Sequence, residues 1–219
     1  MDFVVPPPSP VDVRNPRTAD DFQRLGNLFE QRGELEKAIS SYDAAIHLAP
    51  GNSLLYIQRA RALVRQGDNK HADADCTKAL SLDKKSVFAH IVRAEALSAQ
   101  GEFRRAKDDL ETALSIDKAN VIASCNLAWI LATCPEADLR DGKRAVELAT
   151  SACEKLNWER PETLDTLAAA TAETGDFEAA TRVQKKALAL PAEAQLKSTM
   201  NEHLLSYQAR KPLRDPAAK

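Results

Sequence analysis

The stretch from Phe22 to Pro50 reads FQRLGNLFEQRGELEKAISSYDAAIHLAP, and Gly33 separates two helical patterns within it. A glycine recurs at the same place in the next two units, at Gly67 and Gly101, so the spacing is 34 residues each time. A fixed period of this length indicates an array of repeats, each of them one supersecondary unit. Glycine suits a turn between two helices because the first helix commonly ends in a left-handed residue.

Alanines follow the same period on the second helical pattern of each unit. They form two columns, which are Ala38, Ala72 and Ala106, and Ala45, Ala79 and Ala113. The columns are seven residues apart, which places them on one face of a helix. We expect these small side chains to let two helix backbones approach closely.

These residues resemble the tetratricopeptide repeat (TPR) family. Its pattern, W-x2-L-G-x2-Y … A-x3-F … P, is matched within residues 19–52 by Phe22, Leu25, Gly26, Phe29, Ala38, Tyr42 and Pro50. The resemblance implies an all-α fold, a right-handed solenoid of five helix-turn-helix repeats closed by a C-terminal capping helix.

The repeats are expected within residues 18–191. Their approximate ranges are 19–52, 53–86, 87–120, 121–160 and 161–191. Residues 1–17 hold five prolines and predict an extended arm. Residues 192–219 predict a capping helix and a tail, with Leu196, Met200, Leu204 and Tyr207 on the apolar face of that helix.

The fourth repeat departs from the 34-residue period. Gly101 and Gly175 are 74 residues apart, which is two periods plus six. The pattern predicts a helix over 121–133, a long loop from Cys134-Pro135 to Gly142, and a second helix over 143–156. Residues 126–215 also resemble a module of bacterial TPR proteins that tends to close an array, in the pieces Asn126–Pro135, Arg140–Ala149, Leu164–Ala180 and Tyr207–Arg214.

Composition excludes several classes of function. The net charge of −2 gives no basic field for nucleic acid or for an anionic membrane surface. No apolar run reaches the roughly 20 residues that span a bilayer. We therefore expect a soluble cytoplasmic protein with no nucleic-acid or membrane partner. We also expect no cofactor, and the resemblance of residues 126–215 to a bacterial module implies a protein of bacterial type.

One cluster of polar residues, at His71, Asp73 and Asp75, could suggest a metal site. His71 and Asp75 share a helix face but Asp73 points away, so we expect no metal site there. Asp75 has a better explanation, because repeats two and three carry arginine at Arg59 and Arg93 and aspartate sixteen residues later, at Asp75 and Asp109. These columns predict intra-repeat ion pairs that are at least partly buried. The four cysteines (Cys76, Cys125, Cys134 and Cys153) form no C-x-x-C pair, so we expect free thiols and no disulfide. The spacing gives no Ser/His/Asp or Cys/His set and no glycine-rich phosphate loop, so we expect no enzyme.

The first helices of a TPR array line its concave face, and this implies a peptide-binding groove. The candidate residues are Leu54, Ile57, Arg61, Phe88, Ile91, Glu95, Ile122 and Trp129. We expect an apolar centre anchored by Trp129, which would bind an apolar or amphipathic segment of another protein. The residues at position two of each repeat, such as Phe88, could instead be core.

Three other readings concern the partner. Some co-chaperone TPR domains clamp an acidic C-terminal peptide, but only Asn27 fits that clamp, since Gln23, Gln58, Phe88 and Val92 hold the other places. We therefore do not expect that ligand class. One alternative is self-assembly as a homo-oligomer, in which the groove takes the Phe3-Val4-Val5 arm. The other is a regulatory appendage that acts in trans on an enzyme.

Overall fold

The computed structural model describes residues 16–215, and the part of the chain so described is helical, without any strand. The predicted all-α class is therefore confirmed. The helices are α1 (Ala19–Gln31), α2 (Leu35–Leu48), α3 (Ser53–Gln66), α4 (Asn69–Leu82), α5 (Val87–Ala99), α6 (Phe103–Ile116), α7 (Val121–Thr133), the 3-10 turn η1 (Ala137–Leu139), α8 (Gly142–Lys155), α9 (Pro161–Glu173), α10 (Phe177–Ala189) and α11 (Ala194–Gln208).

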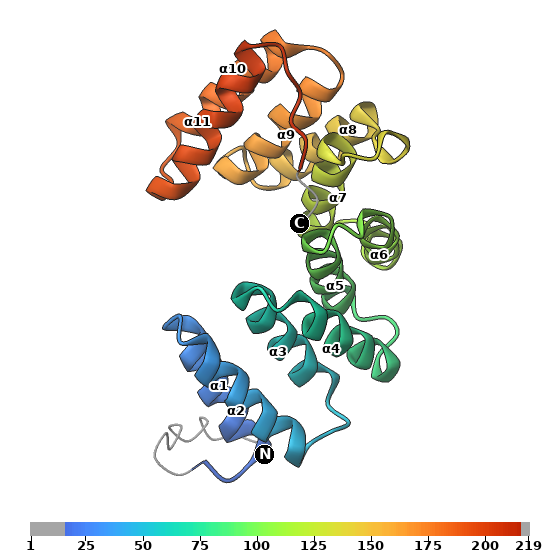
Figure 1. Cartoon of the computed structure of the whole chain (residues 1–219), viewed down its shortest axis with the longest axis vertical. Helices are drawn as coiled ribbons and strands as arrows, with labels where there is room; N and C mark the ends of the chain where they lie inside the picture. The colour runs from blue at the N-terminus through green and yellow to red at the C-terminus, as the bar shows by residue number, and fades with distance from the viewer. Residues whose placement is uncertain (1–15, 216–219) are drawn as a thin grey trace, which may run out of the picture. The chain divides into compact units, whose positions relative to one another are not determined.

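The chain forms two compact units, Met1–Val92 and Arg93–Lys219, and their boundary falls within α5. Inside each unit, consecutive helices pack as pairs, for example α1 with α2 and α9 with α10 (Figure 1). The predicted arm of residues 1–17 lies almost wholly outside the described residues, since residues 1–15 are not among them.

Glycine makes the turn between paired helices, as the sequence predicts. Gly33, Gly67, Gly101 and Gly175 have φ angles of 75°, 90°, 79° and 89°. An L-residue with a side chain is disfavoured in this left-handed region, whereas glycine is not. The 34-residue spacing of the glycines therefore reflects a turn that needs a left-handed residue in each repeat.

The alanine columns lie in the buried core. All six of these alanines are 0% exposed. Gly26 makes a related close approach on α1, because a Cβ added there would lie 2.5 Å from Cε1 of Tyr42. The tyrosine ring thus packs directly on the backbone of α1, and a larger residue at position 26 would displace it.

Both predicted ion pairs are present. Nε and Nη2 of Arg59 donate to the carboxylate of Asp75 at 2.7 and 2.6 Å. Arg93 grips Asp109 in the same two-point way, at 2.7 Å for each bond. The aspartate side chains are only 10% and 7% exposed. Each pair ties the first helix of a repeat to the second, and the two-point geometry favours arginine over lysine.

The long loop of repeat four is confirmed, and it is packed. Helix α7 ends at Thr133, and α8 starts at Gly142. Asp141 is the N-cap of α8, because its side chain accepts a hydrogen bond from the backbone N–H of Arg144. Leu139, in η1 between them, is 3% exposed. One apolar anchor and one N-cap therefore hold the insertion in place.

Helix α11 packs against α10 and buries Met200 and Tyr207, which are 0% and 1% exposed. After α11 the chain turns back, runs past α9 and reaches α7 (Figure 1). Residues of α7, α9 and this returning segment form the surface described next.

Candidate peptide-binding surface

The first unit carries five of the predicted groove residues, and the structure divides them. Leu54 on α3 and Phe88 on α5 are 48% and 61% exposed. Ile57 and Ile91 are buried instead, at 6% and 3% exposed. The expectation for these two residues was wrong: in α3 the position-two residue faces solvent and the position-five residue belongs to the core. For Ile57 the cause is the packing of α3 against both α2 and α4, which covers the rest of its first turn.

Arg61, the fifth of these residues, belongs to an ion-pair cluster. Its Nη2 lies 2.8 Å from Oε1 of Glu30, and Nη1 of Arg65 lies 3.3 Å from the same oxygen. The Glu30 side chain is only 8% exposed. A buried carboxylate requires such partners, so the Arg61 guanidinium is engaged in the ion pair with Glu30.

The hydroxyl of Tyr42 completes this polar cluster. Its oxygen lies 2.7 Å from Oδ1 of Asn27 and 3.0 Å from Oε2 of Glu30, and its single proton can serve one acceptor at a time. Burial, together with the charge of Glu30, raises the pKa of Tyr42. Above the cluster is a polar pocket of about 350 Å³, lined by Asn27, Glu30, Gln31, Gln58, Arg61 and Arg65.

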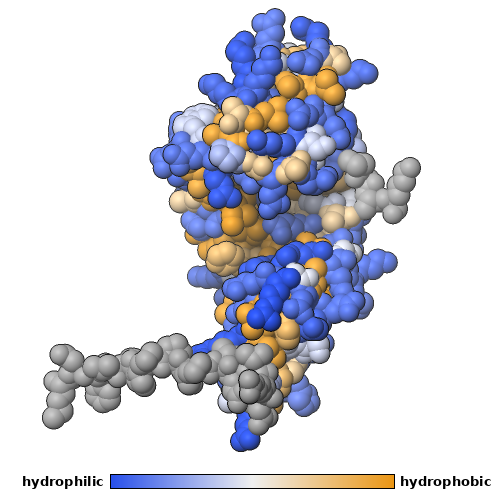
Figure 2. Space-filling model, turned by 90° about the vertical axis from the view of Figure 1, so that its left-hand side faces the viewer, coloured by the Kyte–Doolittle hydropathy of each residue, from blue (hydrophilic) through white to orange (hydrophobic). Residues whose placement is uncertain are grey.

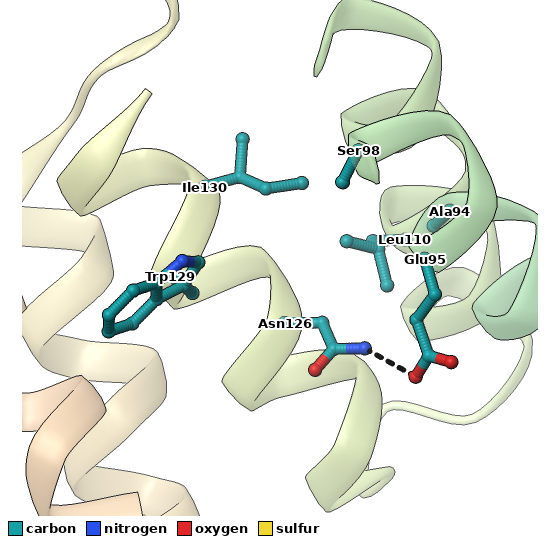
Figure 3. A pocket seen from close by; sticks show the side chains of 7 residues that line it. All are labelled: Ala94, Glu95, Ser98, Leu110, Asn126, Trp129 and Ile130. Carbon is teal, nitrogen blue, oxygen red and sulfur yellow. Dashed lines mark hydrogen bonds between the residues drawn. The ribbon is translucent and has the colours of Figure 1, made fainter. Parts of the chain in front are cut away.

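The second unit holds a pocket with apolar walls, between α5, α6 and α7 (Figure 3). Its volume is about 240 Å³. It is lined by Ala94, Glu95, Ser98, Leu110, Asn126, Trp129 and Ile130, and we call it the Trp129 pocket. Nδ2 of Asn126 donates to Oε1 of Glu95 at 3.1 Å, and this pair closes one end. A pocket below the roughly 300–1,000 Å³ of small-molecule sites suits one side chain of a peptide.

The predicted residues Glu95 and Trp129 therefore line the same pocket. Ile122 does not line it, but it is 50% exposed and lies two turns before Trp129 on α7. Residues seven apart share a helix face, so Ile122 continues the apolar surface by about 10 Å along the axis. On the face that Figure 2 displays, hydrophobic residues in orange reach the surface among hydrophilic ones in blue.

The surroundings of Trp129 include parts of the chain that sequence analysis did not connect with it. The indole Nε1 donates to Oδ2 of Asp215 at 3.1 Å. The ring of His203, on α11, lies 5.8 Å from the Trp129 ring between centroids. Nδ1 of His203 in turn lies 2.9 Å from Oδ1 of Asp165, a buried carboxylate on α9. The proposed anchor is thus half-buried against its own chain.

The returning segment also contacts Glu173, at the end of α9. Oε2 of Glu173 accepts from Nη1 of Arg214 at 2.7 Å, and its Oε1 accepts from Nε of Arg140 at 2.9 Å. The pattern Tyr207–Arg214 was visible in the sequence, but nothing there assigned it a contact. Its partners lie 41 and 86 residues away, at separations unrelated to the repeat period.

The cysteines and the acidic clusters show no reactive arrangement within residues 16–215. No disulfide joins the four cysteines, and no group of three or more His, Cys, Asp or Glu residues is placed to hold a metal ion. Burial raises the pKa of Cys125 to about 11, and it also raises the pKa of Cys153. These thiols are therefore neutral and weakly nucleophilic at pH 7. Among the same residues, no helix has the length and apolar character to cross a membrane.

Comparison with known proteins shows similarity to tetratricopeptide repeat proteins. The family model of the tetratricopeptide repeat (TPR) matches residues 22–52, 54–86 and 89–120 of this chain. The crystal structure of TTC0263, a thermophilic TPR protein of Thermus thermophilus, has a TM-score of 0.70 at 18% identity and covers 86% of this chain and 100% of that one. The MamA protein has a TM-score of 0.61 at 17% identity and covers 84% and 94%. These two likenesses confirm the TPR solenoid fold.

A curated relative shares more sequence over a shorter span. The translocon at the outer membrane of chloroplasts 64, from Pisum sativum, is 36% identical over 75 residues, which is 34% of this chain. The aligned region is only 13% of that protein's length.

Proposed function

We propose that this protein is a non-enzymatic scaffold that binds a segment of another protein, and that the apolar part of the segment binds at the Trp129 pocket. The observation that carries the proposal is an open pocket with apolar walls next to a half-buried tryptophan. Tryptophan is enriched among the residues that dominate binding energy, and such residues lie in pockets that become desolvated on binding.

The edges of the pocket supply the polar side of recognition. Glu95 is exposed and Asn126 is hydrogen-bonded to it, so a basic or amide group of the partner would meet acceptors there. Ile122 extends the apolar contact along α7, and exposed apolar side chains of this size favour coverage by a partner. In the first unit, Leu54 and Phe88 are further candidate contacts, whereas Ile57 and Ile91 are not.

The test uses a defined probe, a library of random 12-residue peptides displayed on phage and selected on the full chain. Peptides enriched on the unchanged protein are measured against Trp129→Ala. The matched control is Trp158→Ala, because Trp158 is 44% exposed and does not line the pocket. We expect Trp129→Ala to weaken binding by ~2 kcal/mol, or about 30-fold, and Trp158→Ala to leave it unchanged. Equal binding to both variants, with circular dichroism showing intact helices, would exclude the pocket as the binding site.

A further inference from the structure

The segment after α11 is directed onto α7 and α9 by a defined turn. The backbone N–H of Lys211 donates to the carbonyl of Ser206 and that of Arg210 to the carbonyl of Tyr207, both at 2.9 Å. This pair of bonds is the Schellman motif, and Arg210 takes its left-handed position with a φ of 56°. A residue other than glycine is disfavoured there, and the guanidinium of Arg210 lies 5.6 Å from the centre of the Phe177 ring. The contact of the Arg210 side chain with Phe177 therefore helps to hold the turn.

Three consecutive residues of the segment then make three chemically different contacts. Leu213 packs on the buried cluster of Ala168, Ala172, Ala180 and Tyr207. Arg214 pairs with Glu173 at 2.7 Å. Asp215 accepts from the indole of Trp129, and its own N–H donates to the carbonyl of Thr133 at 2.8 Å. The order along the chain is apolar, basic, acidic.

The receiving groups on α7 and α9 remain usable when the segment leaves. Glu173 keeps Arg140 as a second partner, so its charge stays compensated. Thr133 is the last residue of α7, and carbonyls in the last turn of a helix have no partner within it. The indole of Trp129 is a donor at the edge of an open pocket. Together with the apolar cluster under Leu213, these groups provide an apolar surface, a carboxylate, an N–H donor and a backbone acceptor.

We propose that this surface recognises a partner segment with an apolar, a basic and an acidic residue in succession, and that Leu213–Asp215 is its built-in occupant, which the partner displaces. The inference rests on the proposed function, because Trp129 belongs to both. On displacement, the partner's apolar, basic and acidic side chains would replace the same contacts that residues 213–215 make. The displaced side chains are accessible, since Arg214 is 37% exposed and both Leu213 and Asp215 are part-exposed. The segment thus acts as an intramolecular competitor for the partner.

The experiment measures binding of a synthetic peptide, Lys-Pro-Leu-Arg-Asp with blocked ends, to the full chain. Trp158→Phe makes Trp129 the sole tryptophan and the fluorescent reporter. The test variant adds Leu213→Ser, Arg214→Ala and Asp215→Ala, which empties the surface without shortening the chain. We expect the peptide to change Trp129 emission and to bind this variant at least 10-fold more tightly than the chain with its own segment. The control peptide Lys-Pro-Ser-Ala-Ala should not bind.

Several outcomes would overturn the inference. Equal affinity for both chains would mean that the segment does not compete, and absence of binding to a folded variant would mean that the surface does not recognise this chemistry. If the triple variant loses its helical signal, the single variant Asp215→Ala is used with the same peptide. Unfolding of that variant as well would make the segment an integral part of the fold. A dimer of the unchanged chain that the triple substitution dissociates would assign the occupant to a second copy. If library peptides bind at Trp129 but this peptide does not, only the inference fails and the proposed function stands.

Discussion

The indole Nε1 of Trp129 lies 3.1 Å from Oδ2 of Asp215, a residue 86 positions further along the chain. The tryptophan that sequence analysis selected as a partner's anchor is therefore already in contact with the chain itself. This contact connects the proposed binding pocket with the segment that follows α11. Substitutions in that segment should therefore change the environment of the Trp129 indole.

Removing the carboxylate should loosen the segment. Asp215→Ala removes the acceptor of the indole N–H, and we expect it to lower the free energy of unfolding by about 1 kcal/mol, the usual net value of one hydrogen bond. Urea denaturation followed by circular dichroism measures the change. Glu202→Ala, at an exposed acid of α11, is the control and should change stability by less than about 0.5 kcal/mol. An effect of Asp215→Ala no larger than that of the control would contradict a stabilising role for the contact.

The Arg93–Asp109 pair should be costly to break from one side only. The Asp109 side chain is 7% exposed, so Asp109→Ala leaves a poorly solvated guanidinium and should cost on the order of 3 kcal/mol. The double change Arg93→Leu with Asp109→Val copies Leu167 and Val183 of repeat five and should recover much of the loss. The matched comparison is Arg104–Asp138, a pair of similar length (2.6 Å) with side chains 61% and 64% exposed. Asp138→Ala should cost far less, because water solvates both charges. A double mutant no more stable than the worse single mutant would refute the pairing.

Two buried tyrosines should respond in opposite ways to loss of the hydroxyl. The hydroxyl of Tyr207 has no hydrogen-bond partner within residues 16–215, whereas that of Tyr42 contacts Asn27 and Glu30. Tyr207→Phe should therefore leave stability unchanged or raise it, because an unsatisfied buried polar group is removed. Tyr42→Phe should lower stability by about 1–2 kcal/mol. Chemical denaturation of the two variants at pH 7 separates these expectations, and an equal loss in both would contradict them.

The same tyrosines predict a loss of stability at alkaline pH. Burial raises the pKa of both Tyr42 and Tyr207 above the ordinary value of 10.0. Above about pH 10 the unfolded chain loses these protons while the folded chain keeps them, so the free energy of unfolding falls as pH rises. Urea denaturation at pH 9 and pH 11 should show a smaller fall for Tyr207→Phe than for the unchanged protein. Identical falls would mean that Tyr207 ionises alike in the folded and unfolded chains.

Periodicity explains what the sequence could predict. The turn glycines, the alanine columns and the Arg93–Asp109 pair were all found because each recurs at a fixed offset in several repeats. The long loop before Gly142 was found as a departure from that period. Each of these features reflects packing within one helix pair, which the order of residues determines.

The incorrect or missed features depend on contacts that do not repeat. The burial of Ile57 follows from the packing of α3 between two neighbouring helices, and no pattern in its own repeat shows this. The contacts Arg214–Glu173 and Asp215–Trp129 join residues 41 and 86 positions apart. Such single long-range pairs leave no recurring signal in one sequence, so the contacts of residues 213–215 with α7 and α9 were found only in the structure.

The central claim is that a partner segment binds at the Trp129 pocket. Its most direct test is the pair of indole N–H signals in a ¹⁵N-correlation spectrum, since the chain has two tryptophans, Trp129 and Trp158. On addition of a peptide selected from the displayed library, the account predicts that the Trp129 signal shifts in proportion to occupancy and that the Trp158 signal stays in place. An unmoved Trp129 signal at saturating peptide would contradict the account.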